Sequence, residues 1–199
     1  MLEPNIREQI IELIHRQVVP AVGCTEPMAV ALCAARATEL LGEKPEKVSV
    51  LLSANILKNA MGVGIPGTGM IGLPIAIALG VLIGKSDYRL EVIKDLTPES
   101  LEAGKRFIGE DRIDIKLKEG ITEKLYIEVC CETAGHRATA VISGSHTNIV
   151  FEETDGKVLL DRLKPSAAAA DTAQLCLDLR TVWEFATTTP VEEIDRSEE

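Results

Sequence analysis

The chain has 199 residues, of which 46% are hydrophobic and 26% are charged, and it carries a formal net charge of −10. That composition is typical of a globular protein and excludes disordered, collagen-like and coiled-coil chains. Aromatic residues make up only 3% of the sequence. Because base stacking needs aromatic side chains and phosphate binding needs positive charge, we expect no nucleic-acid partner.

The cysteines and the first residues of the chain bear on its compartment. Five cysteines at irregular spacing do not fit a secreted disulfide framework, and the first residues show no signal-peptide pattern. The uncharged stretch 59–84 is as long as a membrane helix, but its glycines and prolines favour a loop followed by a shorter buried helix. We therefore expect a cytoplasmic protein without a membrane span.

Apolar residues at helical spacing predict five helices, at about residues 5–19, 26–41, 73–83, 98–107 and 168–185. Thr25 is the expected N-cap of the second helix, and Gly42 ends it. The third helix is apolar throughout and is therefore expected to be buried. In the last helix Leu175, Leu179 and Val182 are expected to face inward.

Alternating apolar and polar residues predict a strand at 47–53 and an antiparallel meander at about 112–160. With helices packed on this antiparallel sheet, the expected class is α+β, as a single domain over residues 1–187. The last sixteen residues hold half of the net charge. Residues 188–199 are accordingly expected to form an acidic linker or tail.

The glycine-rich stretch contains the segment Pro66-Gly67-Thr68-Gly69, and a GxGxxG pattern begins at Gly67. A dinucleotide site would need a strand running into that turn within a parallel βαβ unit, and neither is expected here. Two explanations stay open: backbone N–H groups that bind a carboxylate, or tight helix packing that requires small residues. Lys58 and Asn59, just before the stretch, are candidate substrate-binding residues, although the lysine could simply mark where the buried sequence begins.

Cys24 lies in the polar segment Gly23-Cys24-Thr25-Glu26-Pro27, at the expected start of the second helix. The positive end of a helix lowers the pKa of a thiol, so Cys24 is a candidate catalytic residue. The alternative, a small buried hydrophobe, is preferred for Cys33 and Cys176 because their surroundings are apolar. No cysteine spacing matches a metal or cluster motif, so we expect no metal site formed by this chain alone.

A polar loop, Gly144-Ser145-His146-Thr147-Asn148, separates two strands of the predicted meander. It carries more hydrogen-bonding groups than a connection needs. His146 is therefore a candidate for proton transfer, with Ser145, Thr147 and Asn148 as candidates for substrate binding. The alternative is an ordinary turn in which these side chains bond to the backbone.

Three segments together carry a resemblance: PAVGCTEP at 20–27, NILKNAMGVGIPGTGMIGLPIA at 55–76 and GSHTNIV at 144–150. In this order they resemble the L-cysteine desulfidase family, relatives of the iron–sulfur L-serine dehydratase alpha chain. The resemblance implies a β-elimination lyase that converts L-cysteine to hydrogen sulfide, ammonia and pyruvate, with a [4Fe–4S] cluster and without pyridoxal phosphate. It also implies that Cys24 is the base that removes the α-proton. By position, Pro66-Gly67-Thr68-Gly69 and residues 145–148 would line the substrate pocket.

Members of that family are considerably longer, and their cluster-ligating cysteines lie in a C-terminal half that has no counterpart here. The resemblance therefore implies a chain that is inactive alone and works with the missing half or with a partner subunit. The alternatives are an L-serine dehydratase, which eliminates water by the same mechanism, and a non-catalytic module that binds small carboxylates. A mean hydropathy of +0.13 indicates a buried interface, either with the missing half or with a second copy in a homo-oligomer.

Overall fold

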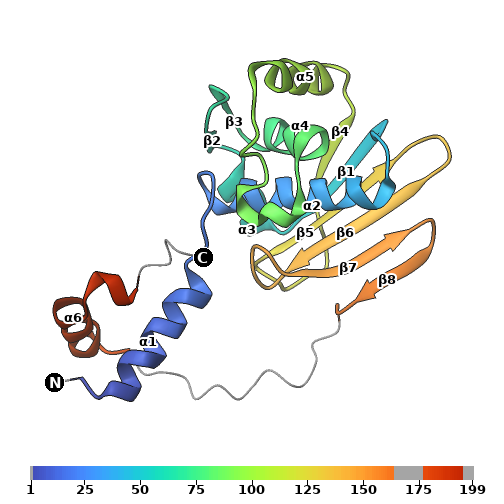
Figure 1. Cartoon of the computed structure of the whole chain (residues 1–199). Coiled ribbons are helices and arrows are strands. Elements are labelled where there is room, and N and C mark those ends of the chain that lie inside the picture. The colour runs from blue at the N-terminus through green and yellow to red at the C-terminus, as the bar shows by residue number, and fades with distance from the viewer. Residues whose placement is uncertain (1, 164–176, 195–199) are drawn as a thin grey trace. The chain divides into compact units, whose positions relative to one another are not determined.

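The computed structural model describes residues 2–163 and 177–194, which fall into two compact units (Figure 1). The larger unit comprises residues 20–163, and the smaller one comprises residues 2–19 and 177–194. All three segments that carry the resemblance lie in the larger unit.

A six-stranded mixed sheet spans the larger unit, in the order β4-β1-β5-β6-β7-β8. Its strands are β1 (Lys47–Leu52), β4 (Ile113–Leu117), β5 (Tyr126–Glu132), β6 (Arg137–Ser143), β7 (Ile149–Thr154) and β8 (Lys157–Asp161). Strands β5 to β8 form an antiparallel meander, and β1 joins it antiparallel to β5. Helices pack on this sheet, so the predicted α+β class is confirmed.

The prediction is wrong for β4, which is not the first strand of the meander. It pairs with β1 in parallel at the edge of the sheet, with Val48 opposite Ile113 and Leu52 opposite Leu117. Parallel neighbours need a long crossover, and the chain between β1 and β4 supplies one that contains helices. Local alternation predicts this strand but does not encode its partner.

The larger unit contains the helices α2 (Thr25–Leu41), α3 (Ala54–Ala60), α4 (Leu73–Ile83) and α5 (Pro98–Gly109), and a short hairpin of β2 (Gly64–Ile65) and β3 (Met70–Ile71). The helices lie in layers, with α2 against the sheet, α4 against α2 and α5 outermost (Figure 1). Gly42 ends α2 in the left-handed conformation, as predicted. Helix α4 is buried over most of its length, which its unbroken apolar sequence predicts.

Helices α2 and α4 approach closely because glycines lie at their contact. A Cβ atom on Gly80 would lie 2.4 Å from the backbone oxygen of Ala31, and one on Gly84 would lie 2.7 Å from the Ala35 Cβ atom. Both distances are far below van der Waals contact, so any larger residue would push the helices apart. Tight helix packing therefore accounts for these two glycines.

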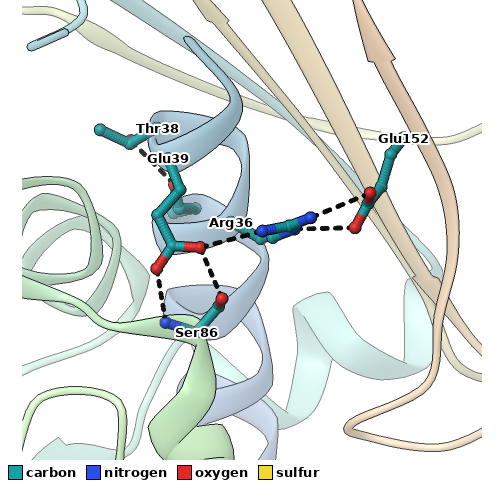
Figure 2. A network of polar contacts seen from close by, with 6 residues as sticks. Arg36, Thr38, Glu39, Ser86 and Glu152 are labelled. Atoms are coloured by element: carbon teal, nitrogen blue, oxygen red, sulfur yellow. Dashed lines mark hydrogen bonds and ion pairs between the residues drawn. The ribbon is translucent and has the colours of Figure 1, made fainter. Parts of the chain in front are cut away.

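A polar network holds the middle of α2 to the sheet and to the 3-10 turn η1 (Ser86–Glu91) (Figure 2). The Arg36 guanidinium donates from Nε and Nη2 to the two carboxylate oxygens of Glu152 on β7, at 2.7 and 3.1 Å. Its Nη1 donates to Glu39 at 3.3 Å, and Glu39 also accepts hydrogen bonds from the N–H and the hydroxyl of Ser86. Because the Glu152 side chain is only 12% exposed, this pair fixes the position of α2 along the sheet.

The smaller unit contains α1 (Pro4–Gln17), α6 (Leu179–Thr188) and the 3-10 turn η2 (Val191–Glu193). Phe185 is buried, but the prediction that Leu179 and Val182 face inward is wrong, because they are 85% and 46% exposed. The predicted last helix begins later than expected, at Leu179; its residues 168–176, with Leu175, lie outside the described residues, as do residues 195–199 of the predicted acidic tail. No helix in residues 2–163 or 177–194 has the length and apolar character that crossing a membrane requires.

Candidate functional site

The Cys24 segment opens helix α2 and touches the glycine-rich turn. Cys24 itself is the N-cap and Thr25 is the first helical residue, so the predicted cap is wrong by one position. Gly23 has a φ of +95°, and a Cβ atom there would lie 2.7 Å from the Pro66 ring. A larger residue would be both strained and blocked at this position. The structure thus brings two of the three segments into contact.

Glu26 is the centre of what we call the Glu26 cluster, which consists of Cys24, Thr25, Glu26 and Asn59. Its Oε2 atom accepts hydrogen bonds from the Cys24 thiol at 3.1 Å and from the Thr25 hydroxyl at 3.2 Å. Its Oε1 atom accepts one from the Asn59 side-chain amide, at 3.3 Å, so that α3 contributes to the cluster at the start of α2. Cys24, Asn59 and the adjacent Lys58 are exposed, which leaves the cluster open to a small molecule.

The thiol–carboxylate hydrogen bond shifts two pKa values in opposite directions. Desolvation and the bond to Glu26 raise the pKa of the Cys24 thiol above its ordinary value. The same bond, with help from Asn59 and Thr25, lowers the pKa of the Glu26 carboxyl. The predicted lowering of the Cys24 pKa is therefore wrong, because desolvation and the hydrogen bond to Glu26 raise it. At neutral pH the proton stays on sulfur and the negative charge stays on Glu26.

The segment Pro66–Gly69 forms the turn between β2 and β3, which pair antiparallel. Gly67 and Gly69 have φ values of +76° and +65°, as the turn requires, and both are exposed. The Thr68 hydroxyl is buried and donates a hydrogen bond to the Ile65 carbonyl at 2.7 Å. Thr68 therefore closes the turn, and its role as a substrate-binding residue stays a prediction.

The contacts of α2 with β5 show which end of the sheet its N-terminus faces. The Cys33 sulfur lies 3.7 Å from the Ile127 carbonyl oxygen, and the Thr38 hydroxyl lies 3.6 Å from the Cys131 sulfur. Helix α2 therefore runs, toward its N-terminus, to the end of the sheet where β5 begins. At 1.5 Å per helical residue, Cys24 lies about 13 Å beyond Cys33 in that direction.

The same end of the sheet carries α3 and the loop 144–148. Leu52 at the end of β1 pairs with Ile127, and Ser143 at the end of β6 pairs with Tyr126. Helix α3 follows β1 directly, and the loop follows β6. All three segments that carry the resemblance are therefore located toward one end of the larger unit.

The loop 144–148 is closed by Asn148. Its side-chain amide donates to the carbonyl at the end of β6 at 2.9 Å, and its N–H donates to the Ser145 carbonyl at 3.2 Å. His146 and Thr147 are half-buried, and Ser145 is exposed. Within the described part of the chain, no hydrogen bond or ion pair joins this loop to the Glu26 cluster, so a common site stays a prediction.

The described cysteines do not converge on one point. Cys33, Cys130 and Cys131 are buried, whereas Cys24 is exposed, and Cys176 lies outside the described residues. Residues 2–163 and 177–194 contain no group of three or more His, Cys, Asp or Glu side chains that could hold a metal ion. Because a [4Fe–4S] cluster needs several cysteine thiolates around it, the described residues do not fit one.

A surface hollow lies at the opposite end of the sheet, where β1 and β6 begin, and Lys47, His136, Arg137 and Asp155 help to line it. His136 Nδ1 lies 2.9 Å from Asp155 Oδ2; this contact raises the pKa of the imidazole and lowers that of the carboxyl. Both acidic and basic side chains line this hollow, and none of the three segments that carry the resemblance contributes a residue to it. The Glu26 cluster is therefore the candidate site.

Sequence reasoning missed Glu26, which it treated only as a residue of the first helical turn. An acidic residue in the first turn of a helix, beside a thiol at the N-cap, was the signal that could have found it. No sequence signal predicts the part played by Asn59, because its contact with Glu26 depends on how α3 packs beside α2.

Comparison with known proteins gives names without an activity. The chain is 65% identical over 188 residues to UPF0597 protein BF3560 of Bacteroides fragilis, a match that covers 94% of this chain and 44% of the relative. A UPF0597 protein of Bacteroides thetaiotaomicron is 63% identical over 188 residues, with the same coverage of 94% and 44%. One of Aeromonas hydrophila is 46% identical over 188 residues, covering 93% and 42%. The chain thus spans less than half the length of these relatives, and no protein-family model matches it.

Proposed function

We propose that the chain contributes part of the active site of a β-elimination lyase, which converts L-cysteine to hydrogen sulfide, ammonia and pyruvate. The observation that carries this proposal is the exposed Cys24 thiol, which donates a hydrogen bond to Glu26 beside the Pro66–Gly69 turn. These residues belong to two of the segments that resemble the L-cysteine desulfidase family.

In this proposal Cys24, as the thiolate, is the base. It takes the α-proton of the substrate, the electron pair of the Cα–H bond forms a Cα=Cβ double bond, and the Cβ–S bond breaks to release sulfide. Water then hydrolyses the aminoacrylate to pyruvate and ammonia. The exposed position of Cys24 lets the α-carbon of a small amino acid reach the sulfur.

The neighbouring groups would bind the amino acid. The turn at Gly67 and Gly69 exposes backbone that can bind a carboxylate, and the exposed Lys58, next to Asn59 in the chain, would add a positive charge to the pocket. His146 would complete the pocket from the loop at the same end of the sheet, together with Ser145, Thr147 and Asn148.

A [4Fe–4S] cluster in such an enzyme supplies a Lewis acid for the leaving group. Because the described side chains do not fit a cluster, we propose that cysteines outside this chain hold it. The relatives have more than half of their length outside the match, which leaves room for such ligands in a missing half or a partner subunit. An oxygen-sensitive cluster also suits a reducing cytoplasm.

The test is a sulfide and pyruvate assay on the polypeptide at its natural length, after anaerobic cluster reconstitution. Cys24→Ala is expected to lower sulfide release from L-cysteine by about a thousandfold, as for loss of a general base. Cys33→Ala, on the same helix but buried, is the control and should keep the activity. Full activity in Cys24→Ala would remove Cys24 from the base role.

The same assay separates the alternatives. Pyruvate formed faster from L-serine than from L-cysteine would replace the desulfidase by an L-serine dehydratase of the same mechanism. Binding of small carboxylates without any turnover would replace both by a non-catalytic binding module. For the 199-residue chain alone we expect no iron-dependent absorbance after reconstitution; stoichiometric iron and sulfide on it would contradict the cluster assignment.

A further inference from the structure

We propose that the base of this site is the Cys24–Glu26 pair rather than the thiol alone: Glu26 receives the thiol proton, and Asn59 and Thr25 hold its carboxylate in position. The inference rests on the proposed elimination. It assigns to Glu26 a role that the resemblance does not supply.

The geometry supports a direct proton path from sulfur to oxygen. The thiol already donates to Glu26 Oε2, with 3.1 Å between sulfur and oxygen. The Thr25 hydroxyl donates to the same oxygen and the Asn59 amide donates to the other one, so the carboxylate is held from both sides. Because these donors come from α2 and from α3, the carboxylate keeps its orientation only while the two helices stay packed.

The proton transfers of the Cys24–Glu26 pair balance over one turnover. The S–H bond of Cys24 breaks, its electron pair stays on sulfur, and the proton forms an O–H bond at Glu26. The thiolate then takes the α-proton of the substrate and becomes a thiol again. Glu26 returns its proton to the departing HS⁻ ion, which leaves as hydrogen sulfide. The pair therefore ends with one proton on sulfur, as it began, and no external acid is needed.

The charges near the thiol explain why the pair stays inactive without substrate. Desolvation raises the pKa of the Cys24 thiol, and Glu26, the charged side chain that acts on it, raises that pKa further, so the proton stays on sulfur. Thr25 and Asn59, the other members of the cluster, are uncharged. The α-ammonium group of an amino-acid substrate would place a cation beside the sulfur and favour the thiolate, as cations do for thiols generally.

The first test measures the pH dependence of Cys24 alkylation by iodoacetamide on the 199-residue chain, and it needs no activity. Removing the carboxylate in Glu26→Gln should lower the midpoint and make alkylation at pH 7 about fivefold faster. Glu102→Gln removes an exposed carboxylate on α5 and should leave the profile unchanged. An unchanged profile in Glu26→Gln would overturn the pairing of the two side chains.

The second test measures sulfide release by the polypeptide at its natural length. Although Glu26→Gln makes the thiolate easier to form, it removes the proton acceptor and donor, so kcat should fall about a hundredfold. Unchanged or raised kcat would show that the thiol acts alone and would contradict the inference. If the wild-type protein releases no sulfide, the proposed function fails, while the alkylation result still decides whether the pair exists.

Asn59 allows a separate test of the pair. It was predicted to bind substrate, and in the structure its side-chain amide donates a hydrogen bond to Glu26. As a positioning residue, Asn59→Ala should lower kcat with little change in KM and should shift the alkylation midpoint less than Glu26→Gln does. A raised KM with unchanged kcat would return Asn59 to substrate binding and contradict its positioning role.

Discussion

Cys24 and Cys33 lie on the same helix segment and have opposite surroundings. Cys33 is fully buried, and its thiol donates to the Ala140 carbonyl at 3.3 Å, so burial raises its pKa far out of the physiological range. Cys24 is exposed at the helix start, and its thiol donates to a carboxylate that can accept the proton. Helix α2 thus has a buried middle, which contains Cys33, and an exposed N-terminal end, which contains Cys24. Only the exposed end can react with a small molecule.

The largest expected difference between these two regions is in thiol reactivity. On the folded chain, iodoacetamide should modify Cys24 at least about a thousandfold faster than Cys33, because the buried thiol reacts only when the structure opens. The two cysteines lie in the same tryptic peptide, residues 17–36, so fragment-ion mass spectrometry compares them directly. Equal rates in the absence of denaturant would show that the two environments do not differ as described.

The buried part of α2 should not tolerate a larger side chain at its contact with α4. Gly80→Val places a side chain where a Cβ atom already meets the Ala31 backbone oxygen at 2.4 Å, and it should lower the free energy of unfolding by about 3 kcal/mol or more. Urea unfolding followed by circular dichroism measures the loss. Gly109→Ala, where nothing lies within 4 Å of an added Cβ atom, should stay within about 0.5 kcal/mol of the wild type. A loss below about 1 kcal/mol in Gly80→Val would mean that α2 and α4 do not pack so closely.

The Arg36 network should contribute less than the packing but more than a surface ion pair. Arg36→Met leaves the poorly exposed Glu152 carboxylate without its bidentate partner and should cost about 2 kcal/mol. Lys105→Met breaks an exposed ion pair with Glu102 and should cost only about 0.3 kcal/mol. The same urea experiment compares the two variants, and equal costs would mean that the network does not anchor α2.

The smallest expected effect is the pH dependence of the free energy of unfolding that comes from Glu26, at the N-terminal end of α2. The pKa of Glu26 is lowered in the folded state, so its hydrogen bonds stabilise the protein above the ordinary carboxyl pKa of 4.5, and this contribution is lost as the pH falls through the folded-state value. Since the group is only partly buried, Glu26→Gln should be destabilised at pH 7 by less than about 1 kcal/mol. The difference from the wild type should disappear near pH 3, and a difference that grows toward acid pH would contradict the assigned direction.

The sequence predicts what depends on local pattern and fails where distant segments meet. The buried helix α4, the end of α2 at Gly42 and the meander from β5 to β8 follow from periodicity and turn residues. The parallel pairing of β4 with β1 does not, because its partner is set by the helices between them. At the site, the position of Cys24 at the start of α2 follows from the local pattern, but the direction of its pKa shift does not, because the shift depends on desolvation and on the contact with the Glu26 side chain.

The measurement that tests the central claim most directly is alkylation of the unmodified, reconstituted polypeptide at its natural length, with sulfide release and the modification of every cysteine followed together. We expect sulfide release to fall in proportion to modification at Cys24, while Cys33 stays unmodified. Undiminished sulfide release from protein fully modified at Cys24 would contradict the account.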